Sequence, residues 1–349
     1  MLSAERRAPA RGALRGPSQP TLLALIRSAA RRFTAAKLAY GHGTTNAFDE
    51  AVWLALHALH LPLDELEPHL DRKVGPGEAR AVTALVDERI RTRKPTAYLT
   101  REAWLGRHRF YVDERVIVPR SHIAELLRDD LSPWVAEPRR VGAALDLCTG
   151  SGCLAILLAL AFRRARVDAA DVSSAALEVA RRNVAAYRLQ RRVSIVASDL
   201  FAGLKGRRYD AIVSNPPYVS SAVMRQLPPE HRREPALALA GGRDGLDFVR
   251  AIVKGAPAHL NPGGVLIMEI GHNRRRMEAA YPRVPFIWAA LNGGDDCVFV
   301  ITREALQAAL RAPSGRATRG DVSPRPGAAR SPVRASTSAA GRRRRSARA

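Results

Sequence analysis

From residue 141 onward, short apolar segments alternate with helical segments, and this alternation restricts the fold more than any other feature. Five segments have the length and the apolar or β-branched content of buried strands: 143–147, 166–172, 193–198, 209–215 and 264–270. Amphipathic stretches such as SSAALEVARRNVAAYRL separate them. Strands that alternate with helices predict crossover connections, and hence an α/β fold with a mostly parallel, doubly wound sheet.

The segments on either side follow other patterns. Residues 285–302 hold two strand-like stretches around a Gly-Gly connection, which predicts an antiparallel hairpin. Residues 102–118 are rich in aromatic and β-branched residues, and we interpret them as a hairpin that joins two domains. Upstream, Thr21 and Asn46 are candidate N-caps of helices. The predicted helices cover 21–40, 46–60, 61–70 and 77–95.

A glycine-rich loop, DLCTGSGC (146–153), follows the first strand of the sheet. Gly150 and Gly152 permit a tight turn and close approach of a ligand, and the helix that follows offers free N–H groups. The loop lacks the GxGxxG spacing of a dinucleotide site. Three further residues end the next two strands: Asp171, Asp199 and Leu200. Carboxyl ends of parallel strands share one sheet edge, so the pattern predicts a nucleoside site, with Asp171 on the ribose hydroxyls.

The fourth strand ends in Asn215-Pro216-Pro217-Tyr218. This segment cannot continue in a sheet, because neither proline has an N–H and each restricts the residue before it. The following segment, 219–243, is long for a loop, which favours a role in facing the substrate. Glu269, after the fifth strand, is a further candidate pocket residue. Arg120 either contacts the cofactor region or joins the two domains.

Together these motifs resemble the S-adenosylmethionine-dependent methyltransferases that act on amino or amide nitrogen. YGHGTTNAFDEA (40–51), VPRSHIAEL (118–126) and EPALALAGGRDGLDFVR (234–250) narrow the resemblance to the protein glutamine methyltransferases. Within that family the chain is most similar to those that modify protein number three of the large ribosomal subunit. His122 departs from the family pattern, which has proline there. The resemblance implies a seven-stranded Rossmann-like domain, S-adenosylmethionine as cofactor and no metal.

The resemblance also assigns roles to the motif residues. It implies that Asn215, Pro216 and Tyr218 are catalytic and that Pro217 joins them in binding substrate. The expected cofactor residues are Asp146, Cys148, Thr149, Gly150, Ser151, Gly152, Asp171, Asp199, Leu200 and Asn215. A carboxamide nitrogen is a poor nucleophile because its lone pair is delocalised. The Asn215 side-chain oxygen and the Pro216 carbonyl can accept its two hydrogens, while the Tyr218 ring packs on the planar amide.

Three alternatives stay open at this point. The catalytic motifs are shared with the peptide-chain release-factor glutamine methyltransferases and with nucleic-acid adenine amino methyltransferases. A non-catalytic ribosome-assembly factor would use the helical domain and the basic tail. An adenine enzyme needs a region that receives a flipped base, and the helical domain shows no such region.

The expected organisation has five segments. They are a disordered basic extension (1–20), a helical substrate-recognition domain (21–96), a hairpin linker (97–120), the methyltransferase domain (121–306) and a disordered Arg-rich tail (312–349). The formal charge is +23, and the tail alone holds ten arginines and one aspartate. A basic tail fits contact with ribosomal RNA, but a compositional preference for arginine explains it equally well.

Cysteine usage and hydropathy indicate the compartment. The three cysteines, Cys148, Cys153 and Cys297, form no CxxC pair, which favours a reducing environment and argues against a structural zinc. The longest apolar run, 153–162, is too short to cross a bilayer, and the N-terminus lacks a secretory apolar region. We therefore expect a cytoplasmic protein with no membrane contact.

Overall fold

The computed structural model describes residues 19–292, 294 and 296–311. The predicted N-terminal extension, apart from residues 19 and 20, and all of the Arg-rich tail lie outside the described residues, so both predictions stay untested. The domain boundaries also stay predictions, because the described residues form a single compact unit.

The N-terminal part is helical, as expected. Its elements are α1 (Leu22–Ala35), α2 (Ala47–Ala58), the 3-10 turn η1 (Glu67–His69), α3 (Pro76–Thr92) and α4 (Thr96–Thr100). The Thr21 side chain accepts from the Ala24 N–H at 3.2 Å, and the Asn46 side chain accepts from the Asp49 N–H at 2.9 Å. Both predicted N-caps are therefore confirmed. These helices share a core formed around Ile26, Phe33, Leu54 and Val86.

The predictions for residues 61–70 and 102–118 are wrong in part. Residues 61–70 contain only η1 rather than a helix, because Pro62 and Pro68 have no N–H for a helical ladder. The hairpin expected over 102–118 consists of β1 (Ala103–Leu105) and β2 (His108–Phe110), which pair antiparallel. Residues 111–118 pair with no described strand. Instead Val112, Val116 and Val118 are buried in a small core with Tyr98.

Within the described residues, the larger sheet has seven strands in the order β5-β4-β3-β6-β7-β9-β8. Their bounds are β3 (Ala143–Leu147), β4 (Arg166–Asp171), β5 (Val193–Ala197), β6 (Tyr209–Ser214), β7 (Leu260–Glu269), β8 (Ile287–Trp288) and β9 (Val298–Thr302). The first five are parallel, and β9 runs antiparallel to both β7 and β8. The α/β fold and the C-terminal hairpin are therefore confirmed.

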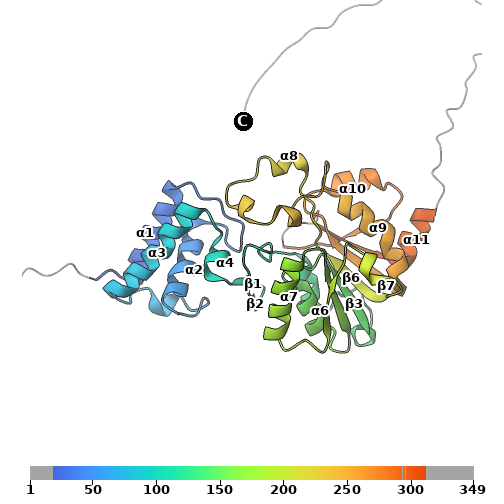
Figure 1. Cartoon of the computed structure of the whole chain (residues 1–349), viewed down its shortest axis with the longest axis horizontal. Helices are drawn as coiled ribbons and strands as arrows, with labels where there is room; N and C mark the ends of the chain where they lie inside the picture. The colour runs from blue at the N-terminus through green and yellow to red at the C-terminus, as the bar shows by residue number, and fades with distance from the viewer. Residues whose placement is uncertain (1–18, 293, 295, 312–349) are drawn as a thin grey trace, which may run out of the picture. The chain divides into compact units, whose positions relative to one another are not determined.

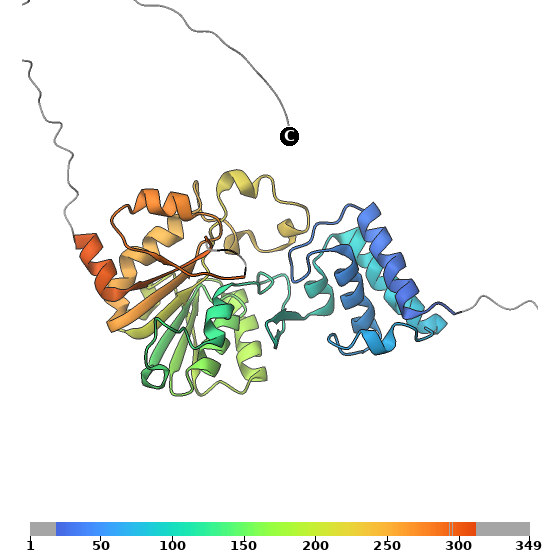
Figure 2. The same ribbon diagram turned by 180° about the vertical axis from the view of Figure 1, so that it is seen from behind.

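Helices cover both faces of this sheet (Figures 1 and 2). One core joins α5 (Ile123–Arg128), α6 (Cys153–Ala161) and α7 (Ser174–Ala186) to strand residues such as Ala144 and Val213. The opposite core joins α9 (Asp247–His259), α10 (Arg274–Ala280) and α11 (Arg303–Arg311) to their sequence neighbours Leu145 and Ile212. Successive strand residues point to opposite faces, so strands buried on both sides are apolar throughout. This explains why the sequence predicted β3 and β6 within one residue. The bounds of β4 and of the edge strand β5 were predicted equally well, although both strands also carry exposed residues.

Short helical turns occupy the connections. They are η2 (Pro138–Arg140), η3 (Ala202–Leu204), α8 (Ser221–Met224), η4 (His231–Arg233) and η5 (Ala236–Ala238). The last three divide the segment 219–243, which returns beside the end of β6. There the Val219 N–H donates to the Leu239 carbonyl and the Gly241 N–H donates to the Val219 carbonyl, each at 2.8 Å. No helix in the described ranges has both the length and the apolar character needed to cross a membrane.

Candidate active site

A pocket lies at the carboxyl ends of β3 to β6. It brings together seven of the residues expected from the sequence: Cys148, Gly150, Asp171, Asp199, Leu200, Asn215 and Pro217. Six other expected residues do not line it: Asp146, Thr149, Ser151, Gly152, Pro216 and Tyr218. The position agrees with the edge at which open α/β sheets bind ligands.

Asp146 is fully buried beneath the glycine-rich loop. Its carboxylate accepts from the Thr149 hydroxyl and, at 2.9 Å, from the Ala155 N–H at the start of α6. Burial raises the pKa of this carboxyl to about 7, although both hydrogen bonds favour the ionised form. Asp146 therefore fixes the shape of the loop from below. The loop itself turns through Gly150 and Gly152, which have φ of +54° and +80°.

Asp171 at the end of β4 is held by two backbone donors. The Gly150 N–H donates to Oδ2 and the Ser173 N–H donates to Oδ1, each at 2.9 Å. Burial raises the pKa of the carboxyl above its ordinary value. Each carboxylate oxygen can accept a second hydrogen bond, so both remain able to bind a pair of neighbouring hydroxyls.

The walls of the pocket fit an adenosine group. A Cβ placed on Gly150 would meet no atom within 4 Å, so the backbone is open to a ligand on that side. Val172, Leu200, Leu237 and Phe248 provide apolar surface for a planar base. The Asp171 carboxylate, the open backbone at Gly150 and the apolar wall together form a site that suits a nucleoside cofactor.

Cys148 lies between two acids in this pocket. Burial raises the pKa of its thiol, and the charges of Asp171 and Asp146 raise it further. The thiol is therefore neutral at physiological pH, and Cys148 is not an activated nucleophile. Among the described residues, no three His, Cys, Asp or Glu side chains are grouped as a metal site would need.

Asn215 and Pro216 follow β6 at the pocket. The preceding residue, Ser214, donates from its hydroxyl to the Leu147 carbonyl at 2.8 Å, which ties the ends of β6 and β3 together. Among the described residues, no hydrogen bond uses the Asn215 side chain or the Pro216 carbonyl. Asn215 lines the pocket and is not among the buried unpaired side chains, so its amide is open to a bound molecule. Pro216 is itself buried and does not line the pocket.

Tyr218 is held in a cradle of glycines. A Cβ on Gly271 would approach the Tyr218 ring to 2.7 Å, and one on Gly245 would approach the Tyr218 carbonyl oxygen to 2.4 Å. That carbonyl accepts from the Asn273 side chain at 3.0 Å. The hydroxyl points to Glu269 Oε1 at 3.4 Å, and burial raises its pKa. The ring is fixed in place, and its expected contact with a substrate amide stays a proposal.

Glu269 supports this region from below rather than lining the pocket. Its Oε2 accepts from the Ser121 hydroxyl at 2.6 Å and from the His122 N–H at 2.9 Å. A proline in place of His122 could not donate this second bond. Burial raises the pKa of Glu269 above its ordinary value.

Glu234 joins the linker to the loop after Tyr218. It is fully buried, and its carboxylate accepts from the Val118 N–H at 2.9 Å and from both terminal nitrogens of Arg120, one at 2.8 Å. His42 Nε2 lies 3.5 Å from the second oxygen. Burial opposes ionisation, but His42 and Arg120 outweigh it and lower the pKa of Glu234 to about 2. Arg120 therefore connects the linker to the loop 219–243, and it does not line the cofactor pocket.

Glu230 makes a second buried connection on the same loop. Its Oε1 lies 2.9 Å from the Arg93 guanidinium and 3.9 Å from that of Arg89. Arg89 is itself buried, and it donates to Glu50 at 2.7 Å. The His42 and His231 rings lie close by, with centroids 4.3 Å apart and planes tilted by 50°. Charged groups this deeply buried are stable only as complete pairs.

Several pocket residues were not expected from the sequence. They are Arg115, Val116 and Ile117 from the linker, Pro235, Leu237 and Ala238 from the loop, and Phe248 at the start of α9. Glu234, which directly precedes Pro235, holds linker and loop together. Only one feature of the sequence points to this contact between linker and loop. Glu234 is an acid within the basic stretch HRREP, and an acid among arginines indicates a paired carboxylate.

Comparison with known proteins agrees with this geometry. A family model for the methyltransferase small domain matches residues 127–227. The chain is 57% identical over 286 residues to the ribosomal protein uL3 glutamine methyltransferase of Bordetella pertussis, covering 82% of this chain and 96% of that protein. The same-named proteins of Burkholderia pseudomallei and Neisseria gonorrhoeae are 53% and 54% identical, again over 82% of this chain and over 96% and 95% of theirs.

Proposed function

Because the chain belongs to the family of ribosomal protein uL3 glutamine methyltransferases, we propose that it methylates a glutamine side-chain amide of uL3. This is protein number three of the large ribosomal subunit, and the methyl donor is S-adenosylmethionine. The observation that carries the proposal is the Asn215 amide, which has no described partner and lines a pocket suited to adenosine. The Pro216 carbonyl that follows it accepts no described hydrogen bond. We place the reaction in the cytoplasm, where ribosomal proteins are made.

Asp171 binds the ribose hydroxyls in this scheme, through the lone pairs that the Gly150 and Ser173 N–H groups leave free. Asp199 and Leu200 hold the base against the apolar wall. When bound, S-adenosylmethionine supplies a methyl group that its positive sulfur already activates. No further activation of the donor is asked of the protein.

The chain's contribution at the acceptor is orientation. Asn215 Oδ1 and the Pro216 carbonyl each accept one hydrogen of the glutamine amide, which turns its nitrogen toward the cofactor side of the pocket. Correct placement of two reactants lowers a barrier by about 7–11 kcal/mol. The glycine cradle and Asn273 hold the backbone at Tyr218, so Pro216 keeps one position. Tyr218 completes the site by packing on the amide plane.

A labelling experiment tests the function. The full chain is incubated with methyl-labelled S-adenosylmethionine and ribosomal extract from cells that lack the endogenous enzyme, and labelled molecules are identified by mass spectrometry. We expect N-methylglutamine in uL3, formed about 100- to 1,000-fold more slowly by the Asn215→Ala variant. Label in a release factor or only in RNA would overturn the assignment, and each result would select one of the alternative substrates.

A further inference from the structure

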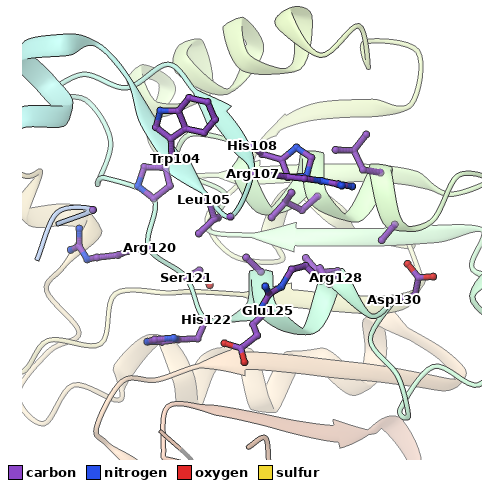
Figure 3. A pocket seen from close by; sticks show the side chains of 18 of the residues that line it. Trp104, Leu105, Arg107, His108, Arg120, Ser121, His122, Glu125, Arg128 and Asp130 are labelled. Carbon is purple, nitrogen blue, oxygen red and sulfur yellow. The ribbon is translucent and has the colours of Figure 1, made fainter. Parts of the chain in front are cut away.

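A second cavity of about 900 Å³ lies apart from the cofactor pocket, and the two share no lining residue. It is enclosed by the β1–β2 hairpin, by residues 119–130 including most of α5, and by the end of α6 (Figure 3). Methyl transfer as derived above uses no part of it. Its size is that of a ligand site rather than a packing defect.

The floor of this cavity is apolar and its rim is basic. The floor consists of Leu105, Ala124, Leu127, Leu157, Leu160 and Ala161. Three exposed arginines, Arg107, Arg128 and Arg163, stand around it. Burial lowers the pKa of the neighbouring His108, with Arg107 adding to the effect, so at neutral pH the arginines provide the positive charge.

These three guanidinium groups have no partner among the residues that the structure describes. Nearby arginines do: Arg109 lies 3.4 Å from Glu102, and Arg120 is paired with Glu234. An arginine that is already paired adds little net charge to a surface, whereas an unpaired one keeps its donors for a ligand. The rim therefore offers three open guanidinium groups at one cavity.

Two acids also line the cavity and reduce its charge only in part. The Glu125 carboxylate accepts from the Asn292 N–H at 3.1 Å. Figure 3 shows Glu125 directed away from Arg107, and Asp130 standing apart from both. With Arg120 neutralised by Glu234, the lining keeps an excess of positive charge. An anionic ligand complements it.

Trp104 gives the site an aromatic edge. Its side chain is 41% exposed on β1, which is unusual for an indole, and its Nε1 donates to Glu102 Oε1 at 2.7 Å. That bond fixes the ring while a face remains accessible. Exposed aromatic rings between cationic side chains are the usual means by which proteins bind single-stranded nucleic acid without reading its sequence.

We propose that this cavity binds a single-stranded segment of RNA. Phosphates are held by Arg107, Arg128 and Arg163, one base rests on the apolar floor, and a neighbouring base stacks on Trp104 at the edge of the cavity. RNA fits better than an acidic peptide, because each nucleotide brings both a charge and a flat apolar group, as rim and floor require. The inference does not depend on methyl transfer, although a ribosomal substrate would place RNA nearby.

Binding of a fluorescent 12-nucleotide RNA by the full chain tests the proposal. The measurement is anisotropy over a salt series, without cofactor, for the parent and for the triple variant Arg107→Ala, Arg128→Ala and Arg163→Ala. A matched control removes three other exposed arginines that lack described partners: Arg80, Arg188 and Arg225. Basic segments outside the cavity are present in all three proteins, so differences report the cavity.

Loss of three phosphate contacts should reduce the slope of log affinity against log salt by about 2. Affinity at moderate salt should fall roughly ten- to hundredfold, while the control variant keeps the parent slope. Trp104→Ala should weaken binding without changing the slope. Equal losses in the triple and control variants would overturn the proposal, as would tighter binding of a poly-glutamate peptide than of RNA. Slower methylation of RNA-free uL3 by the triple variant would assign the cavity to the protein substrate instead.

Discussion

Removing the Glu234 carboxylate should destabilise the protein strongly, although Glu234 is not expected to touch either reactant. Glu234→Ala leaves the Val118 N–H and the Arg120 guanidinium without the acceptor that they share. Deleting one partner of a fully buried ion pair costs about 3–5 kcal/mol, because the other charge stays buried and unpaired. The Arg120 side chain is partly exposed, so we expect the lower end of this range. Glu234→Gln keeps the shape and one acceptor but loses the charge.

The pKa gives an independent magnitude for that charge. The Glu234 carboxyl has its pKa at about 2 in the folded protein against an ordinary value of 4.5. Since one pKa unit corresponds to about 1.4 kcal/mol, the ionised group contributes about 3 kcal/mol to stability. A depressed pKa means that this contribution is complete above pH 4.5 and is lost as the pH falls toward 2. At neutral pH, Glu234→Gln should lose the same stability of about 3 kcal/mol, because the variant lacks the ionised carboxylate.

Urea unfolding followed by tryptophan fluorescence measures the effect. For a chain of this size, 3 kcal/mol corresponds to a fall in the unfolding midpoint of about 1 M. Glu137→Gln is a matched control, because Glu137 pairs with Arg140 on the surface, where both side chains are more than half exposed. That change should cost less than about 1 kcal/mol. If Glu234→Ala unfolds within 1 kcal/mol of the parent, or if Glu234→Gln keeps the acid dependence, our account of this buried pair is wrong.

Three further predictions concern the active site. Asp171→Ala should weaken S-adenosylmethionine binding by about 1.5–3 kcal/mol, roughly 10- to 150-fold, and unchanged affinity in calorimetric titration would refute the ribose assignment. Asn215→Ala should lower turnover at saturating cofactor by about 100- to 1,000-fold, with Asn215→Asp retaining part of it, whereas parent turnover in a folded Asn215→Ala protein would exclude the orienting role. Gly271→Ala should displace the Tyr218 ring and reduce both stability and turnover, whereas Gly263→Ala, also at positive φ but facing open space, should cost only about 1–2 kcal/mol of stability and leave turnover unchanged.

The sequence predicted the parts of the fold that depend on local pattern. The central strands β3 and β6 are largely apolar and buried on both faces, so their limits coincide closely with the limits of the apolar runs. The strand end at Asn215 was also visible, because two prolines exclude a continued ladder. Asp171 and Gly150 were predicted at one edge, and the hydrogen bond between them confirms that they are neighbours.

The parts that failed depend on partners far away in the chain. Val112, Val116 and Val118 have the composition of a strand, but no described strand runs alongside them, and they pack on Tyr98 instead. β-propensity reports a half-buried surface and not the presence of a partner strand. Pocket residues such as Ile117 and Leu237 were missed for the same reason. Each is an ordinary apolar residue until the tertiary fold brings linker and loop together.

The two buried glutamates also bear on how members of this family can recombine. Glu230 and Glu234 lie in the catalytic half of the sequence, yet Arg93 and Arg120, which neutralise them, precede the sheet. A chimaera joined anywhere between residues 96 and 141 would inherit the acids from one parent and most of their cations from another. The helical region and the loop 219–243 must therefore come from the same parent protein, although more than a hundred positions separate them in the sequence. Exchange of specificity between relatives should require both pieces to move together.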